Sequence, residues 1–399
     1  MKNSRRDFLK TSALASASLL MPKFLFAGAG NNPLSNGKKL VVIQFSGGND
    51  GLNCVIPFRT DTYYESRPDI AIFRDEVLRI RDDAGLHPNL PGLADLYHDG
   101  HLAIVNTVGY PNPDRSHFRS MDIWQSASGS NEYLETGWIG RTLDSTCNNK
   151  CTTPHSAVEL DDTLSLALKG KNLKGLAFRN PQVLYETTRQ PLLKKIAEEN
   201  NSANNVSTID FLHKTLTDTM HSAEYLYSQS KIYSSKGMYP NEYFAKQMRT
   251  IAELIISGSE TSVYYVSLSG FDTHVLQKGA HSKLLKLYSD TLKVFCNDLK
   301  TNGRFNETMI LTFSEFGRRV KQNGGQGTDH GTANVVFIAG GGLRKPGLQN
   351  NVPDLQNLVD GDLVHTVDFR SVYATILQNW LNADADLVLN GAFPKMDFA

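Results

Sequence analysis

The sequence predicts an α/β protein in which helices flank a mostly parallel sheet. Short apolar runs bounded by turn residues are typical of strands that are buried on both faces of such a sheet, and Met309–Phe313 and Val335–Ala339 are two of them. Other segments repeat apolar residues every three or four positions, which indicates amphipathic helices. Acidic residues and histidines follow several of the strands, where ligands of α/β proteins usually bind.

The chain begins with a segment that indicates export. Ser4–Lys10 contains paired arginines followed by Phe8 and Leu9, and the apolar run Thr11–Met21 is too short to span a membrane in the mature protein. This segment resembles a twin-arginine export signal. The resemblance implies that the export machinery of that pathway is a partner, that residues 1–29 are removed, and that the protein is periplasmic or extracellular. An uncleaved anchor and a basic N-terminal helix are the alternatives.

Composition argues against a nucleic-acid-binding protein. The 399 residues contain 41 basic and 41 acidic residues. Residues 1–29 hold five of the basic residues and one of the acidic ones, so 36 and 40 remain after cleavage. A mildly acidic chain lacks the basic surface that nucleic acids require. No second long apolar segment is present, so we expect no transmembrane helix in the mature protein.

The remaining elements are expected in the following order. Strands are predicted at Lys39–Phe45, Leu102–Val108, His155–Leu160, Leu173–Phe178 and Val263–Leu268, and helices at Leu90–Asp99, Ser116–Ala127, Leu284–Leu299 and Asp368–Leu381. Between residues 190 and 258 the pattern is entirely helical. We therefore expect residues 36–399 to form a single domain, with 190–258 as a helical insertion or cap.

Possible metal ligands stand where strands end. Carboxylate oxygens and imidazole nitrogens suit zinc or manganese, and a larger share of carboxylates suits calcium. Because the carboxyl ends of parallel strands meet at one edge of a sheet, we expect a divalent metal site there. The candidate ligands are Asp50, Asp272, His274, Glu315, Asp329 and His330. Each could instead be an ordinary turn or surface residue.

Ser116 lies where the N-cap of a helix is expected, with Arg115 and His117 beside it. The start of a helix favours an oxyanion, and a hydroxyl there can act as a nucleophile if a metal or base lowers its pKa. Serine is also a common N-cap without any catalytic role.

Of the four cysteines, Cys147 and Cys151 lie close together in a polar segment. Outside the cytoplasm this pair could form a small disulfide loop. A structural metal is the weaker alternative, because no further Cys or His follows at the spacing of a zinc finger.

Five motifs, FSGGNDGLN, RSHFRSMDIW, GFDTH, FSEFGRR and GTDHGTANVVFIAGGG, carry a family resemblance. They resemble a family of exported proteins of unknown function, numbered 1501 among such families, within the alkaline phosphatase superfamily. That superfamily also includes sulfatases. The resemblance implies a three-layer fold whose mostly parallel sheet is flanked by helices.

The resemblance also implies roles for individual residues. Asp50 is similar to the acid after the first strand, Ser116 to the nucleophile, and Asp272 with His274 to the mid-chain metal ligands. Two alignments are open for the remaining positions. In one, Asp329-His330 is the Asp-His pair and His365 the late histidine; in the other, which element order favours, Glu315 is the acid and His330 the late histidine. The second alignment places Phe316 where a histidine ligand would stand.

These residues imply an exported, metal-dependent hydrolase of phosphate or sulfate esters. Ser116 would attack, and Arg318 would hold the oxyanion, since a guanidinium can grip two oxygens; Arg115 is a second candidate for that role. The partner would be an anionic ester, either a small molecule or a glycan. A non-catalytic protein on the same fold that binds a metal or a glycan, or a secretion accessory protein, is the alternative.

Overall fold

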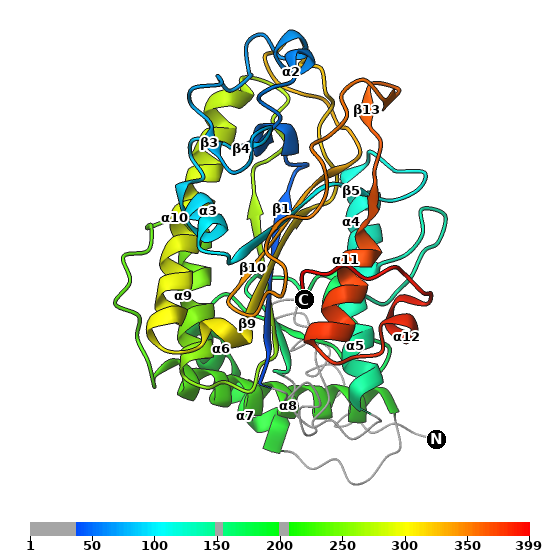
Figure 1. Ribbon diagram of the computed structural model, residues 1–399. Coiled ribbons are helices and arrows are strands. Elements are labelled where there is room, and N and C mark those ends of the chain that lie inside the picture. The colour runs from blue at the N-terminus through cyan, green and yellow to red at the C-terminus, as the bar shows by residue number, and fades with distance from the viewer. Residues whose placement is uncertain (1–36, 148–154, 199–206) are drawn as a thin grey trace.

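A nine-stranded sheet forms the centre of the protein (Figure 1). The structure is a computed structural model that describes residues 37–147, 155–198 and 207–399. The strand order is β11-β5-β10-β9-β1-β8-β6-β7, and β14 pairs with β5. The strands are β1 (Lys39–Ser46), β5 (Leu102–Gly109), β6 (Ala157–Glu159), β7 (Leu176–Ala177), β8 (Val263–Ser269), β9 (Thr308–Ser314), β10 (Asn334–Gly340), β11 (Gly347–Leu348) and β14 (Val367–Asp368).

The sheet is mixed but mostly parallel, as predicted. β1 pairs in parallel with both β8 and β9, so that Ile43 lies between Val266 and Thr312. β10 is antiparallel to its neighbours β9 and β5. Every other pairing in this sheet is parallel among the described residues.

Helices cover both faces of the sheet and complete a three-layer α/β fold (Figure 1). This confirms the predicted fold class. One face packs against α3 (Pro91–His98), α6 (Pro181–Thr188), α8 (Ser207–Ser230), α9 (Tyr243–Ile256) and α10 (Gln277–Thr301). The other face packs against α4 (His117–Ser126), α5 (Trp138–Cys147), α11 (Phe369–Thr375) and α12 (Ala385–Leu389).

Strand β1 shows why the strands read as continuous apolar runs. Val41, Ile43 and Phe45 enter the core on one face, and Leu40 and Val42 enter the core on the other. Side chains alternate along a strand, so a strand covered on both faces needs apolar residues at nearly every position. Each such side chain contributes about 1.5–3 kcal/mol when it is removed from water.

The helical stretch predicted at 190–258 forms α7 (Pro191–Glu198), α8 and α9. Met248, Ile251 and Ile255 of α9 lie in the same core as β1, so this helix is part of the layer that covers the sheet. The description of 190–258 as an insertion or cap, and of 36–399 as a single domain, stays a prediction.

Two helices differ from their predicted bounds for identifiable reasons. α10 begins at Gln277, ahead of Leu284, the first residue of the apolar repeat. Its first turns are held by the buried polar side chains Gln277 and His281, which bond Asp50 and Asn49. The helix predicted from Asp368 is capped by that residue, as expected, but continues after α11 as a π-helix at Ile376–Trp380.

Several small elements were not predicted. A three-stranded sheet has the order β2-β4-β3 and lies beside α2 (Asp61–Ser66). Its strands are β2 (Val55–Ile56), β3 (Leu78–Arg79) and β4 (Gly85–Leu86). A hairpin joins β12 (Leu358–Val359) to β13 (Asp362–Leu363). Short 3₁₀ helices span Gly51–Asn53, Leu166–Leu168 and Phe305–Glu307.

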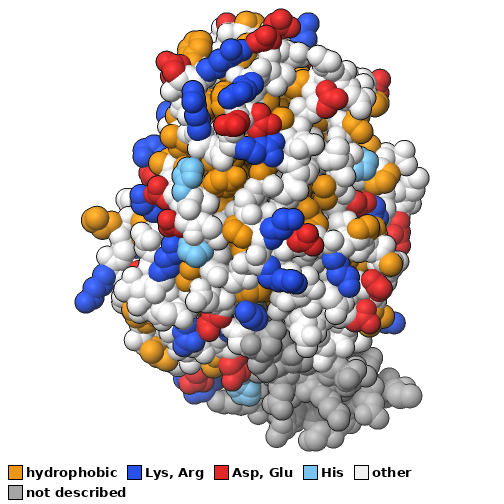
Figure 2. Space-filling view, viewed as in Figure 1, with side chains coloured by type: hydrophobic (Ala, Val, Ile, Leu, Met, Phe, Trp, Pro, Cys, Tyr) orange, Lys and Arg blue, Asp and Glu red, His pale blue; other side chains and the backbone are white. Residues whose placement is uncertain are grey.

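Among the described residues, no helix combines the length and apolar character that a membrane span requires. The predicted export signal at 1–29 lies outside the described residues, and so does the loop that would carry the Cys147–Cys151 disulfide. Cys54 and Cys296 are buried free thiols. On the face shown in Figure 2, basic and acidic side chains are interspersed, with no broad patch of one sign.

The buried side chain of His155 makes the stability of the core depend on pH. Its ring stacks on Tyr225 with centroids 4.0 Å apart, and neither ring nitrogen has a hydrogen-bond partner in the described structure. Burial lowers the pKa of His155 to about 4. Protonation therefore favours the unfolded state, and stability is lost as the pH falls from about 6.5 towards 4.

We predict that His155→Phe raises the free energy of unfolding by about 1–3 kcal/mol at pH 7.5, because it removes two unsatisfied buried polar atoms and keeps the stacked ring. The advantage should grow between pH 6.5 and 4.5. Urea unfolding at pH 7.5, 6.5 and 4.5 measures the difference in unfolding free energy between the variant and the parent protein. The same change at exposed His98, His98→Phe, is the control. Equal pH dependence of His155→Phe and the parent protein would contradict this account.

Candidate metal centre

The sheet brings five chain segments to one edge. β1, β8 and β9 are parallel neighbours, so the loops after them start side by side. β10 runs the opposite way, and hence the residues before it, not after it, reach the same edge. β5, on the far side of β10, is again parallel to β9 and leads to the start of α4. The candidate ligands lie on these five segments.

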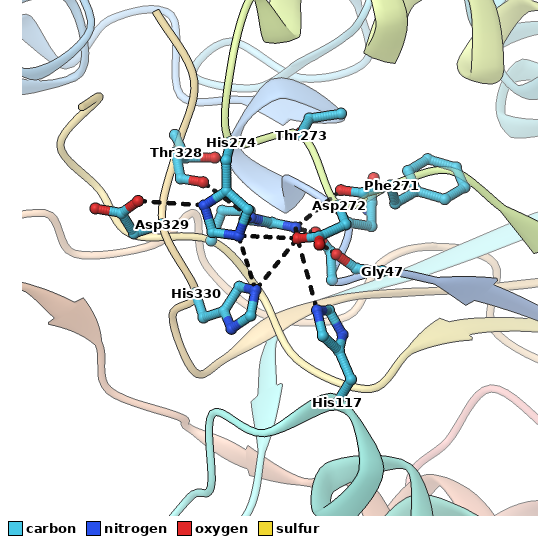
Figure 3. A network of polar contacts seen from close by, with 12 residues as sticks. Gly47, His117, Phe271, Asp272, Thr273, His274, Thr328, Asp329 and His330 are labelled. Atoms are coloured by element: carbon cyan, nitrogen blue, oxygen red, sulfur yellow. Dashed lines mark hydrogen bonds and ion pairs between the residues drawn. The ribbon is translucent and has the colours of Figure 1, made fainter. Parts of the chain in front are cut away.

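Asp272 is the centre of the cluster (Figure 3). Its Oδ1 atom lies 3.0 Å from His274 Nε2, 3.2 Å from His330 Nε2 and 3.6 Å from His117 Nε2. The Nε2 atoms of His274 and His330 are themselves 3.0 Å apart. The structure thus brings together three of the predicted ligands and one histidine, His117, that the sequence interpretation did not count as a ligand.

The opposite nitrogen of each ring is held by an oxygen acceptor. His117 Nδ1 lies 2.9 Å from Glu315 Oε1, and His274 Nδ1 lies 3.2 Å from Asp329 Oδ1. His330 Nδ1 lies 2.9 Å from the carbonyl oxygen of Arg115. Because these oxygens accept, each neutral ring carries its proton on Nδ1 and presents the lone pair of Nε2 to the cluster.

A cation between these atoms would relieve the repulsion of lone pairs that face one another and a carboxylate. His117 Nε2 is buried and has no hydrogen-bond partner among the described residues. A tetrahedral ion with bonds of about 2.0–2.1 Å separates its donor atoms by about 3.3–3.4 Å, close to the three distances from Asp272 Oδ1. His117, Asp272 and His330 form a group whose donor atoms all lie within 4.8 Å of one another. These residues fit a metal ion.

Glu315 and Asp329 serve the cluster indirectly. Glu315 is fully buried, and its carboxylate accepts from the backbone N–H of Gly47 at 2.8 Å and from the Ser314 hydroxyl at 3.0 Å as well as from His117. Asp329 is fixed by Asn323 Nδ2 at 3.0 Å. Both therefore orient histidine rings in the way that carboxylates outside the coordination shell of metal sites do.

The Arg318 side chain is fully buried and its guanidinium is fully engaged. Nε donates to Gly48 O at 2.6 Å and Nη1 to Thr328 O at 2.8 Å. Nη2 donates to Gly47 O, to Phe271 O at 3.0 Å and to Asp272 Oδ1 at 2.7 Å. Nη1 also lies 3.5 Å from His274 Nε2. Each nitrogen of the guanidinium thus has its partners within the protein, so these contacts fit a residue that positions Asp272 rather than the predicted oxyanion clamp.

The electrostatics of the cluster favour positive charge between the ligands. Partial burial opposes ionisation of Asp272, but the hydrogen bond from Arg318 and its positive charge outweigh this effect, and the pKa is lowered to about 2. The hydrogen bond to Glu315 raises the pKa of His117, and Asp272 adds to this effect. Burial lowers the pKa of His330. An ionised carboxylate therefore faces rings that are suited to bind a cation.

Asp50 is not part of this cluster, which corrects its predicted place among the ligands. The side chain is buried, its Oδ2 accepts from Arg67 Nη1 at 2.6 Å, and Gln277 Nε2 donates to the same oxygen. Burial opposes ionisation of Asp50, yet the charge of Arg67 lowers its pKa overall. Oδ2 of Asp50 is thus paired with a guanidinium, while its Oδ1 has no hydrogen-bond partner among the described residues.

Ser116 is the N-cap of α4, as predicted, and its side chain makes no capping hydrogen bond. Both chain neighbours of Ser116 contact the cluster, Arg115 through its carbonyl oxygen and His117 through its ring. The Arg115 guanidinium pairs with Asp362 instead of facing the metal ligands. His365 lines a neighbouring cavity. The alignment in which Glu315 is the acid and His330 the late histidine stays a prediction.

The sequence position of His117 is itself a signal of its place in the cluster. It is the first residue of α4, directly after the N-cap. Side chains at the start of a helix point back towards its N-terminal end, which here faces the edge of the sheet. The adjacent Phe118 is 87% exposed, so the helix turns its apolar neighbour outwards and His117 inwards.

Comparison with known proteins identifies the family. The model of the family described as "Protein of unknown function (DUF1501)" matches residues 100–390, which is more than half of the chain. The chain belongs to this family. The resemblance found in its motifs is thereby confirmed, although the family description names no activity. No curated protein matches the sequence.

Three similar solved structures have at most 10% identity to this chain. A protein of the alkaline phosphatase superfamily from Vibrio parahaemolyticus has 10% identity and a TM-score of 0.41, with 98% of this chain and 78% of that chain covered. A sulfatase from a Pseudoalteromonas species has 9% identity and a TM-score of 0.40, covering 100% and 75%. A lipoteichoic acid synthase from Listeria monocytogenes has 8% identity and a TM-score of 0.36, covering 82% and 72%. We take no residue role from them.

We predict that Asp272→Ala abolishes stoichiometric metal binding, because Asp272 is the oxygen donor on which the three rings converge. Asp50→Ala should behave differently. It should destabilise the protein by about 3–5 kcal/mol, because Arg67 loses its buried counter-ion, while the folded fraction keeps its metal. Elemental mass spectrometry after gel filtration and urea unfolding measure the two quantities. Loss of metal in folded Asp50→Ala, or normal metal content in Asp272→Ala, would contradict the assignment.

The carboxylates behind the rings should tune affinity without being ligands. We predict that Glu315→Gln weakens metal binding by about 10-fold to 100-fold, because an amide oxygen is a poorer acceptor for His117 Nδ1 than a carboxylate. Competition with a fluorescent chelator measures the affinity. Glu307→Gln, a change at a partly exposed glutamate remote from this edge, is the control. An unchanged affinity in Glu315→Gln would mean that His117 does not bind the ion.

Proposed function

We propose that this protein hydrolyses phosphate or sulfate esters with the help of one divalent metal ion. The observation that carries the proposal is the convergence of three imidazole Nε2 lone pairs on the ionised Asp272 carboxylate, with every Nδ1 proton already engaged. The start of α4 lies directly beside this convergence, and its free N–H groups suit an oxyanion.

The donor set favours zinc, with manganese as the alternative. Imidazole nitrogen is a preferred ligand of zinc, whereas calcium takes six to eight oxygen atoms. Among the described residues, Asp272 is the one carboxylate that faces the three Nε2 atoms, so of the three metals expected from the sequence we set calcium aside. When bound, the ion would act as a Lewis acid towards an ester oxygen and promote ionisation of a nearby hydroxyl.

The remaining steps of ester hydrolysis would be carried out by residues of the protein. The Ser116 hydroxyl oxygen attacks the phosphorus or sulfur atom, and the bond from that atom to the alcohol oxygen breaks. Ser116 is exposed, so its proton passes to solvent, and the alcohol leaves with a proton from water. A water molecule then releases phosphate or sulfate from Ser116. Arg318 keeps Asp272 ionised and in place throughout.

A metal-binding protein without catalysis is the second candidate, and His274 is the residue that favours it. His274 Nε2 lies 3.0 Å from both Asp272 Oδ1 and His330 Nε2. If it binds the ion together with the triad, four protein donors close a tetrahedral shell, as in structural sites. If it does not, one position stays open, as in catalytic sites. Export through the twin-arginine machinery remains a prediction in either case.

We predict that Ser116→Ala lowers kcat/KM for a generic aryl phosphate or sulfate by at least roughly a thousandfold and leaves the metal content unchanged, because Ser116 is not a ligand. Ser130→Ala, at a half-buried serine outside the cluster, should keep full activity. Zinc-loaded protein that turns over neither ester would favour the binding protein, and full activity in Ser116→Ala would remove this serine as the nucleophile.

A further inference from the structure

A cavity of about 360 Å³ lies next to the metal centre. The two share a wall, which Phe316 and Arg115 form. The Phe316 ring has its centroid 4.8 Å from that of His117 and 4.7 Å from that of His330, and Arg115 O bonds His330 Nδ1. A group joined to an ester oxygen at the metal centre therefore has space on this side, and the volume suits a small organic group.

A charged hairpin forms the outer wall of the cavity. β12 and β13 are joined by Asp360 and Gly361, which both have positive φ angles, +52° and +84°. Such a two-residue turn suits Asp-Gly and Asn-Gly. The Asp360 side chain is exposed and lines the cavity. In the described structure its carboxylate has neither a hydrogen bond nor an ion pair, so it is available to a ligand.

The lining of the cavity is short of positive charge. Three carboxylates line it, Asp114, Asp360 and Asp362, and Arg115 is the one cation among the described lining residues, which leaves a net charge of about −2. Arg319, behind the wall, lies 3.6 Å from Asp362 and offsets one further charge. His365, whose pKa is lowered by burial, adds no positive charge at neutral pH.

Asp362 shows most directly that the cavity lining has too few positive charges and hydrogen-bond donors. It is 2% exposed, and Arg115 Nε donates to its Oδ2 at 2.8 Å. Its Oδ1 has no hydrogen bond among the described residues and lies 3.6 Å from Arg319 Nε. Burial raises the pKa of Asp362 and Arg115 offsets only part of that rise. A buried carboxylate oxygen without a donor favours a ligand that brings one.

We propose that this cavity receives the alcohol portion of the ester and selects an alcohol that carries an ammonium group. The proposal rests on the hydrolase function proposed above. An ammonium group would gain attraction to the free Asp360 carboxylate and supply donors to the acidic wall. A carboxylate-bearing alcohol would meet like charge in a partly enclosed space, where repulsion is stronger than in water.

Three esters of similar size test the selection. They are the monoesters of ethanolamine, ethylene glycol and glycolate, as phosphates or as sulfates according to which the zinc-loaded protein hydrolyses. We expect kcat/KM to fall in that order, by about tenfold between the first and the last. Equal values for the three esters, or a preference for the glycolate ester, would overturn the proposal.

Asp360→Asn isolates the role of charge, because asparagine suits the same turn. It should reduce the preference for the ethanolamine ester over the glycol ester by about twofold to fivefold, the range of exposed ion pairs. The same change at exposed Asp354, outside the cavity, should leave the preference unchanged. An unchanged preference in Asp360→Asn would overturn the assignment of Asp360.

The cavity can be tested separately from the hydrolase activity. If zinc-loaded protein hydrolyses no ester, the proposed function is wrong, and the cavity is tested by saturation-transfer NMR with free ethanolamine, ethylene glycol and glycolate. Binding of ethanolamine alone, weakened in Asp360→Asn and kept in Asp354→Asn, would support charge selection by the cavity. Absence of ethanolamine binding to the parent protein would overturn it.

Discussion

The buried guanidinium of Arg318 is the interaction on which the metal centre depends. It donates to the carbonyl oxygens of Gly47 and Gly48 after β1, of Phe271 after β8, and of Thr328 before β10. Arg318 itself follows β9, so one planar group ties four of the five segments at this edge of the sheet. The carbonyls leave the cation only partly compensated, and the ionised Asp272 completes the balance. Asp272 is therefore held where the histidines converge.

Two buried arginines, Arg67 and Arg318, pair with Asp50 and Asp272, and the two carboxylates differ in whether they can still reach a ligand. Arg67 bonds Asp50 and Asn53 and also the carbonyls of Arg319 and Val320. Asp50 is consequently neutralised inside the protein, with its second oxygen lacking a hydrogen-bond partner in the described structure. Asp272 also contacts an arginine, but half of its side chain is exposed, so its carboxylate can serve a ligand as well. Removing Arg67 would leave the Asp50 carboxylate as an uncompensated buried charge, which is costly.

The sequence predicts the fold better than the site because the two depend on different information. Apolar periodicity located β1, β5, β8, β9 and β10 and helices α3, α4, α8 and α9, since burial on both faces leaves a local pattern. The strand-end rule also brought Asp272, His274, Glu315, Asp329 and His330 to one edge. It could not distinguish Asp50 from Asp272, because the partner of Asp50, Arg67, lies in a segment without periodicity. His117 was missed for a similar reason, since its ring is oriented by Glu315, which is 198 residues away.

The direction of β10 explains why this site is built from histidines that are far apart in the sequence. If β10 ran parallel to β9, residues 329–330 would lie at the opposite edge of the sheet. Instead the segment before β10 runs back along the loop after β9, where Gly331 N bonds Gly317 O and Arg319 N bonds Asp329 O. This backbone pairing sets His330 beside Arg318. The same reversal leaves β5 parallel to β9, so that the start of α4 delivers His117 and Ser116 from the other side. One antiparallel strand thus places a candidate nucleophile and a candidate metal ligand opposite the loops of a parallel sheet.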